Sequence, residues 1–246
     1  MDLREKVALI TGGTQGIGAA TALALAERGA DIAIVARHID HGVRVKVEAL
    51  GRRCVVIGRD MALPENATAC VQEAVRALGR VDVLVHSAGA RAPGGLMEVT
   101  TEVWHEAFDV HVHAILHLCR AAVPLMKQKG GGAIVLVSSV AGLRGCPGGL
   151  AYGVVKGAIP QFARLLAREL ADENIRVNCV APGIIRTAFQ DYLSPAQAKN
   201  NIDNRIPLHR EGKPEDVAEA IALLATNEFI TGECITLDGG QTMRLA

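Results

Sequence analysis

The sequence predicts a doubly wound α/β fold, in which a parallel sheet carries helices on both faces. Short β-branched runs alternate with longer helical patterns from one end of the chain to the other, the order that crossover units require. The runs are nearly continuous in apolar residues, as strands buried on both faces are. Half of the 246 residues are apolar, and a chain of this length commonly buries one core. We therefore expect a single domain over residues 1–246.

Strands and helices are expected in strict alternation along the chain. β-Branched and apolar runs predict strands at 7–11, 32–36, 53–57, 81–86, 133–138 and 176–180. Longer segments with apolar residues at helical spacing predict helices at 16–28, 64–78, 101–129 and 151–171. Residues 183–214 are the least periodic stretch and too long for an ordinary connection. This stretch predicts a substrate lid at 184–213.

Composition and charge restrict the class of protein. Lys plus Arg equals Asp plus Glu at 26 each, which argues against a nucleic-acid-binding protein and favours a small-molecule role. No apolar run approaches the length of a membrane span, and the first residues are charged rather than an apolar leader. The 6 cysteines show no CxxC pairing, which is typical of free thiols in a reducing compartment. We expect a cytoplasmic protein without a membrane segment.

A glycine-rich turn follows the first expected strand. Thr11 precedes the run Gly12-Gly13-Thr14-Gln15-Gly16-Ile17-Gly18, which opens a helix rich in Ala and Leu. Glycines permit a tight turn and close approach of the backbone to a pyrophosphate, while the helix N-terminus offers N–H donors to the anion. In this strand, turn and helix context the run predicts a dinucleotide site of the Rossmann type. A plain glycine turn is the alternative.

The end of the second strand bears on the choice of dinucleotide. An NAD site usually has an acidic residue there for the ribose 2′-hydroxyl, whereas this strand closes on Ala36, Arg37 and His38. Arg37 can instead meet a 2′-phosphate, which favours NADP(H) over NAD(H). The alternative is that Arg37 is a solvated charge at the end of a strand.

Three polar side chains form the expected catalytic group. Tyr152 and Lys156 are four residues apart on a helix and therefore share a face. An ammonium near a phenol favours the phenolate and lowers the tyrosine pKa toward the range of an acid/base catalyst. Ser139 ends a buried strand thirteen residues before Tyr152, where its hydroxyl can reach the same carbonyl oxygen.

Together these motifs resemble those of the short-chain dehydrogenase/reductase family, in its shorter single-domain branch. The resemblance covers essentially the whole chain and has the family's order and spacing in Thr11-Gly12-x-x-x-Gly16-x-Gly18, Asp60, Ala88-Gly89, Ser139, Tyr152-x-x-x-Lys156, Pro182-Gly183 with Thr187, and Asp238-Gly239-Gly240. It implies oxidoreduction between a ketone and a secondary alcohol with a nicotinamide cofactor. Within the family the chain looks most like the 3-oxoacyl-carrier-protein reductases and the sugar and polyol dehydrogenases allied to them.

The resemblance implies a role for each site residue. Tyr152 would be the general acid/base, Ser139 would position and polarise the substrate oxygen, and Lys156 would hold the nicotinamide ribose. Asp60 would touch the adenine, and residues 182–187 would line the nicotinamide amide and the diphosphate. The expected cofactor contacts are Gly12, Thr14, Gln15, Gly16, Ile17, Gly18, Arg37, His38, Asp60, Met61, Ser87, Ala88, Gly89, Tyr152, Lys156, Pro182, Gly183, Ile185 and Thr187.

Two departures from the family pattern fall near the expected site. The family often has Asn-Asn-Ala-Gly where this chain has His86-Ser87-Ala88-Gly89, and often has a catalytic Asn where this chain has His111. Neutral imidazole offers one donor and one acceptor, so we expect His111 to face the active site and to replace that Asn in a proton relay. The alternative is a packing histidine.

In the family the long helix and the helix of Tyr152 form a dimer contact, which implies a homotetramer.

Other interpretations stay open at this stage. His105, His111, His113 and His117 share one helix, but no further ligands are recognisable, so we expect no metal site. The alternative functions are an NAD-dependent sugar or polyol dehydrogenase and a cofactor-binding regulatory protein without turnover. The intact catalytic group argues against the regulator. The substrate is expected to be a small carbonyl or alcohol, in a mainly apolar pocket lined by Arg91, Leu143, Cys146, Leu150, Phe189 and Tyr192.

Overall fold

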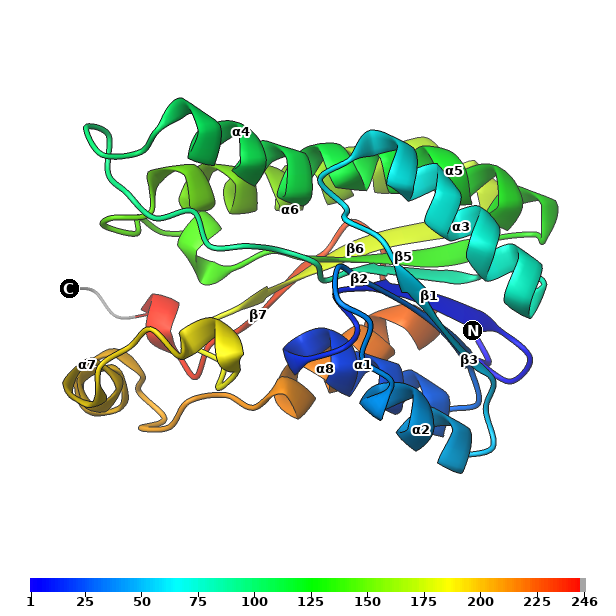
Figure 1. The fold of residues 1–246 in the computed structure, drawn as a ribbon, viewed down its shortest axis with the longest axis horizontal. Helices are drawn as coiled ribbons and strands as arrows, with labels where there is room; N and C mark the ends of the chain where they lie inside the picture. The colour runs from blue at the N-terminus through cyan, green and yellow to red at the C-terminus, as the bar shows by residue number, and fades with distance from the viewer. Residues whose placement is uncertain (244–246) are drawn as a thin grey trace.

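The computed structural model describes residues 1–243 and contains a 7-stranded sheet in the order β3-β2-β1-β4-β5-β6-β7 (Figure 1). The strands are β1 (Val7–Thr11), β2 (Asp31–Ala36), β3 (Cys54–Gly58), β4 (Val83–His86), β5 (Gly132–Val137), β6 (Ile175–Pro182) and β7 (Cys234–Leu237). Every neighbouring pair is parallel. The chain runs outward from β1 to β3, returns to the centre at β4 and runs outward again. The doubly wound parallel sheet predicted from the sequence is confirmed.

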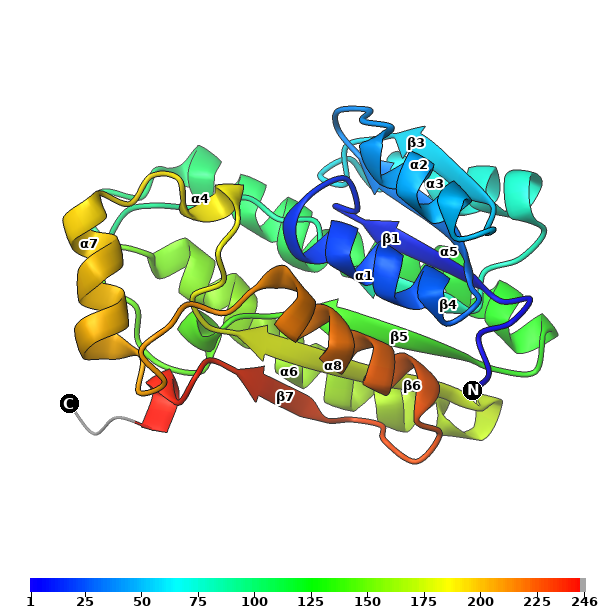
Figure 2. The same cartoon turned by 90° about the horizontal axis from the view of Figure 1, so that it is seen from below.

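Helices cover both faces of this sheet (Figures 1 and 2). One face carries α3 (Pro64–Leu78), α5 (Ala114–Gln128) and α6 (Leu150–Leu170). The other face carries α1 (Gly16–Glu27), α2 (Gly42–Ala49) and α8 (Pro214–Thr226). A cluster of buried apolar side chains fills each of the two layers, which explains why the strands read as continuous apolar runs.

Several elements differ from the sequence prediction. The sequence did not predict α2, whose buried residues are Val43 and Val47, and it predicted neither α8 nor β7. The long helix expected at 101–129 is divided into α4 (Thr101–Phe108), a π-helical turn η1 (Asp109–His113) and α5. The expected lid segment is less irregular than predicted, since it contains the helical turns η4 (Ala188–Gln190) and η5 (Asn201–Arg205) and the helix α7 (Pro195–Asn200). Figure 2 shows α4 and α7 at the same end of the molecule.

The structure also bears on cysteine, metal and membrane chemistry. All of the cysteines, Cys54, Cys70, Cys119, Cys146, Cys179 and Cys234, are free. Within residues 1–243 no group of three or more His, Cys, Asp or Glu side chains is arranged to hold a metal ion. His113, from the expected histidine-rich helix, instead contacts Asp109 at 2.8 Å. In the same part of the chain, no helix combines the length and the apolar character needed to cross a bilayer.

Candidate active site

A cavity of about 1260 Å³ lies along the carboxyl ends of the strands. It crosses the point between β1 and β4 where the strand order reverses, which is where doubly wound sheets place their ligands. The cavity is lined by every residue that the sequence predicted for catalysis, and by every predicted cofactor contact except Gly18. Gly18 is buried beneath the turn, where an added Cβ would overlap the carbonyl oxygen of Gly12. Its role is therefore close packing of helix on strand.

The glycine turn is built for close backbone approach. Gly12 has a φ of +69°, and an added Cβ would lie 2.9 Å from the backbone nitrogen of Ala88. Gly16 has a φ of +53° and begins α1. No side chain caps this helix and its first turn holds no acidic residue, so its leading N–H groups face the cavity without a competing acceptor. These features fit the pyrophosphate of a dinucleotide.

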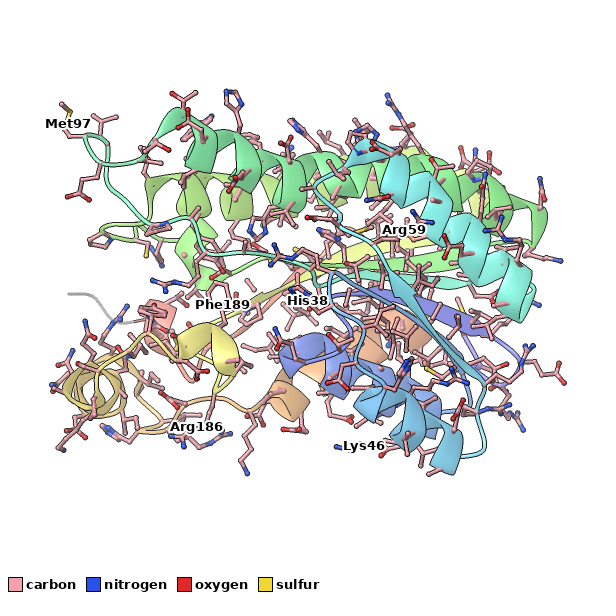
Figure 3. All side chains as sticks on the ribbon, in the orientation of Figure 1. His38, Lys46, Arg59, Met97, Arg186 and Phe189 are labelled. Atoms are coloured by element: carbon pink, nitrogen blue, oxygen red, sulfur yellow. The ribbon has the colours of Figure 1, made fainter. Side chains whose placement is uncertain are left out.

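The far end of the cavity, after β2 and β3, carries mixed charge. Arg37, His38 and Arg59 line the cavity there, and Figure 3 shows His38 and Arg59 on the side away from Phe189. Arg59 donates to Glu73 at 3.1 Å and was not among the predicted contacts. The carboxylate of Asp40, also missed, accepts from the Gly42 backbone N–H at 2.8 Å in a turn that leads into α2. Both residues come from the connections after the strands, where the sequence offers no recognisable motif.

The predicted catalytic side chains come together from β5 and α6. Ser139 follows β5, and its hydroxyl accepts from the Ala141 backbone N–H at 3.2 Å. Lys156 is 5% exposed, and its Nζ donates to the Val137 carbonyl at 2.8 Å. Its Nζ lies 5.8 Å from the ring centroid of Tyr152. The Ser138 hydroxyl, which the sequence analysis missed, donates to the Lys156 carbonyl at 2.7 Å and ties α6 to the end of β5.

Burial has the largest effect on the pKa values of Tyr152 and Lys156. It raises the pKa of Tyr152 to about 12, against which a hydrogen bond from Ser139 acts. Burial also lowers the pKa of Lys156 to about 7. The expectation that Lys156 lowers the tyrosine pKa is therefore wrong for this structure, because the apolar surroundings penalise the charged forms of both groups. Tyr152 is held as a proton donor at neutral pH.

The two histidines that depart from the family pattern are both buried, each 1% exposed. His111 lies in the π turn, where its Nε2 is 2.9 Å from the Ala90 carbonyl oxygen and 3.2 Å from the Ala90 backbone nitrogen. Its Nδ1 is buried and has no hydrogen-bond partner among residues 1–243. The ring lies edge-on to Tyr152 with 5.8 Å between centroids, and an added Cβ at Gly89 would be 2.5 Å from its Cε1.

His86 joins the glycine turn to the π turn. Its Nε2 donates to the Val110 carbonyl at 3.0 Å, which leaves Nδ1 to accept from the Thr11 hydroxyl at 2.9 Å. Thr11 Oγ1 in turn accepts from the Ala88 backbone N–H at 3.2 Å. Burial, with the nearby charge of Lys156, lowers the pKa of His86 to about 4, so it is neutral in the folded protein. The sequence marked this histidine as a departure but gave no signal of the connection.

His86 is expected to make the fold sensitive to acid. Its pKa is about 4 in the folded protein against an ordinary 6.5, so the unfolded chain takes up the proton first as the pH falls. This group's contribution to the free energy of unfolding is therefore intact above its ordinary pKa and decreases toward its folded pKa. Between pH 7 and pH 5 the loss is about 2 kcal/mol, measured by urea unfolding.

His86→Asn is the matched variant, because an amide keeps a donor and an acceptor but does not titrate. Its free energy of unfolding is expected to fall by about 2 kcal/mol less than that of the wild type over the same pH interval. An equal loss in the two proteins would contradict the neutral, buried state of His86.

The predicted substrate lining is partly wrong. Arg91, Cys146, Phe189 and Tyr192 line the cavity, whereas Leu143 and Leu150 do not. Leu143 lies at the end of the short turn after Ser139 and is exposed, and Leu150 begins α6. Arg144 and Arg205, which the sequence analysis did not name, line the cavity as well. The pocket is therefore more charged than the mainly apolar site that was expected.

Comparison with known proteins gives the family. Residues 12–242 match a family model described as enoyl-(acyl carrier protein) reductase. The 3-oxoacyl-[acyl-carrier-protein] reductase FabG of Thermotoga maritima is 37% identical over 245 residues, 98% of this chain and 99% of that protein. Human dehydrogenase/reductase SDR family member 4 is 36% identical over 249 residues, 99% of this chain and 90% of that protein.

A solved structure agrees with these relatives. L-sorbose reductase from Gluconobacter frateurii, complexed with NADPH and L-sorbose, superposes with a TM-score of 0.92 at 33% identity, over 100% of both chains. The resemblance stated from the motifs is thus confirmed. With the family match and the fold, it shows that this chain belongs to the short-chain dehydrogenase/reductase family and is an oxidoreductase acting on alcohol and carbonyl groups.

Proposed function

We propose that this protein interconverts a ketone and a secondary alcohol with NADP(H), using Ser139, Tyr152 and Lys156. The observation that carries the proposal is that these three side chains and the glycine turn line one cavity. An acid, a positioning hydroxyl and a buried ammonium therefore stand where a dinucleotide bound at the turn would end. When bound, the cofactor supplies the hydride.

The chain's own residues account for the rest of the reduction. The Tyr152 phenol, protonated at neutral pH, gives its proton to the carbonyl oxygen. The Ser139 hydroxyl donates a second hydrogen bond to that oxygen and orients it. Lys156 is anchored to the Val137 carbonyl, from which its ammonium can hold the ribose hydroxyls. His111, whose buried Nδ1 has no hydrogen-bond partner among residues 1–243, would take part in the relay that returns a proton to Tyr152.

The proposed roles of Arg37 and of the lid segment are those that the sequence predicts. Arg37 would bind the 2′-phosphate of NADPH, the cofactor present in the L-sorbose reductase structure. Residues 184–213 would act as the lid, because Phe189 and Tyr192 line the cavity opposite Tyr152. A single domain, a cytoplasmic location and a homotetramer stay predictions. The similarity to L-sorbose reductase favours a sugar or polyol as the second candidate substrate class.

An NADPH-oxidation screen tests the proposal. The panel comprises β-keto esters, acyl thioesters, diketones, cyclic ketones and keto sugars, each with NADPH and with NADH. Oxidation that depends on the carbonyl compound and yields the secondary alcohol is the expected result. Tight NADPH binding without turnover of any carbonyl would favour the regulatory protein instead.

NADPH is expected to be preferred over NADH by at least about tenfold in kcat/KM, since a charge-assisted contact of Arg37 with the 2′-phosphate is worth that much. Ala36→Asp combined with Arg37→Gln is expected to invert the preference, because a carboxylate then meets the ribose hydroxyls and repels a phosphate. Arg76→Gln, an exposed arginine on α3 outside the cavity, is the control. A wild-type preference for NADH would reject this role of Arg37.

Variants at His111 separate a relay from packing. His111→Asn keeps a donor and an acceptor and is expected to retain activity within about tenfold, whereas His111→Leu should lose about 10²-fold in kcat. Burial, with the nearby charge of Lys156, holds the pKa of His111 well below its usual value, so the imidazole is neutral at pH 7. A pH–rate profile of the three proteins measures this. Wild-type rates for His111→Leu at every pH would make His111 a packing residue.

A further inference from the structure

Three arginines line the part of the cavity beyond Tyr152, away from the glycine turn. Arg91 follows β4, Arg144 follows the turn that Ser139 begins, and Arg205 ends η5 in the lid segment. They come from segments far apart in sequence. Figures 1 and 2 show the connection from β4 to α4 and the segment around α7 at the same end of the molecule. The fold thus gathers positive charge at the mouth of the cavity.

Arg91 is oriented by an aromatic side chain of the lid segment. Its guanidinium carbon lies 3.6 Å from the ring centroid of Tyr192. Three residues earlier, the Phe189 ring lies 6.0 Å from the ring of Tyr152, so the lid segment that carries the stack also reaches that tyrosine. Stacking on a ring occupies the flat face of a guanidinium and leaves its N–H donors free in the plane. Those donors match the two oxygens of a carboxylate or phosphate.

Arg205 is also held in place. Its Nη1 donates to the side-chain oxygen of Asn201 at 2.9 Å, and Asn201 is 4% exposed. Arg144 is exposed on the loop between Ser139 and Cys146, where it lines the cavity. Two of the three guanidinium groups are therefore oriented by neighbours that carry no charge. Orientation in advance lowers the entropy lost when a ligand binds.

The charges around this end of the cavity do not balance. Within residues 1–243, no ion pair joins Arg91, Arg144 or Arg205 to a carboxylate. The opposing carboxylate that lines the cavity there is Glu106, on α4. Three positive groups against one negative group in a concave site attract and concentrate an anion.

We infer that the substrate carries an anionic group, a carboxylate or a phosphate, which Arg91, Arg144 and Arg205 bind while its carbonyl meets Tyr152. The inference rests on the proposed function, because it names the substrate class of the same site. Arg91 and Arg144 line the same cavity as Tyr152, so one substrate can place its anionic group on the arginines and its carbonyl at Tyr152. A keto acid or a phosphorylated keto compound has both groups.

Matched pairs of carbonyl compounds test the inference. The first set pairs α-, β- and γ-keto acids with their methyl esters, and the second pairs a keto sugar phosphate with the unphosphorylated keto sugar. The charged member of at least one pair is expected to have a kcat/KM at least about tenfold higher. That advantage should shrink as NaCl is raised, because salt screens exposed charges. The first set identifies a carboxylate and the second a phosphate.

Substitutions assign the effect to the arginines. Arg91→Gln and Arg144→Gln are each expected to reduce the ratio of kcat/KM for the charged member to that for the neutral member by about tenfold. Arg91→Lys keeps the charge but loses the stacked, forked geometry, so it should recover only part of the ratio. Arg76→Gln is the control and should leave the ratio unchanged. If the neutral and the charged member have equal kcat/KM in every pair, the inference is overturned and the proposed function still stands. Absence of turnover for all carbonyls would reject both.

Discussion

Tyr152→Phe is expected to lower kcat for carbonyl reduction by about 10²- to 10⁴-fold, because the variant lacks the proton that the substrate oxygen must receive. The phenyl ring still fills the space beside His111 and Phe189. The dissociation constant for NADPH should therefore stay within about threefold of the wild-type value, since the ring rather than the hydroxyl fills that space. Steady-state kinetics with a carbonyl from the screen and NADPH fluorescence measure the two quantities.

The matched control for this variant is Tyr192→Phe, which removes the other tyrosine hydroxyl of the cavity. It keeps the ring under Arg91 and should change kcat far less than Tyr152→Phe does. If Tyr152→Phe retains more than about a tenth of the wild-type kcat, the proton comes from another group. Loss of NADPH binding in that variant would instead point to a damaged site.

Lys156→Met is expected to impair both chemistry and cofactor binding. The isosteric apolar side chain packs in the buried position but leaves the Val137 carbonyl without its donor. We expect kcat to fall by about 10²-fold or more and the dissociation constant for NADPH to rise by about tenfold or more. Rapid-mixing and equilibrium fluorescence measurements separate these effects.

The pH dependence of NADPH binding gives a second test of Lys156. A lysine is charged below its pKa, and the pKa of Lys156 is lowered to about 7 by burial. The ammonium is therefore lost as the pH rises through that value, and NADPH should bind progressively more weakly between pH 6 and pH 9. Lys156→Met, which has no such charge, should bind weakly with no dependence of this kind. The same slope in both proteins would place the titrating group elsewhere.

The proposed catalytic group and most of the sheet could be predicted from the sequence because both depend on short-range patterns. Four residues separate Tyr152 from Lys156 on one helix, and Ser139 stands at the end of a continuous apolar strand. The helix α2 was missed because its stability depends on burying two valines against the sheet rather than on a long apolar stripe. The π turn has no local signal either, since its carbonyl at Val110 is held by His86 from the sheet.

Long-range packing also explains the errors in the predicted pocket. Whether Leu143 or Arg144 lines the cavity is decided by the rotation of a single turn after Ser139. Arg205 reaches the cavity only because η5 folds the lid segment back on itself. The pKa expected for Tyr152 was wrong because spacing reports the distance to a charge but not the depth of burial. The lining of the cavity and the burial of Tyr152 depend on contacts between segments that are far apart in the sequence.

The central place of β1 in the sheet has a consequence during synthesis. β1 is complete at Thr11, but β4, one of its two neighbours, begins only at Val83. At translation rates of about 5–20 residues per second, the ribosome takes roughly 4–14 s to make the intervening segment. During that time the strand Val7–Thr11, which is buried along its whole length in the folded protein, lacks this neighbour. An unpaired edge of a strand can pair with other chains, so this edge is exposed to aggregation until β4 is made.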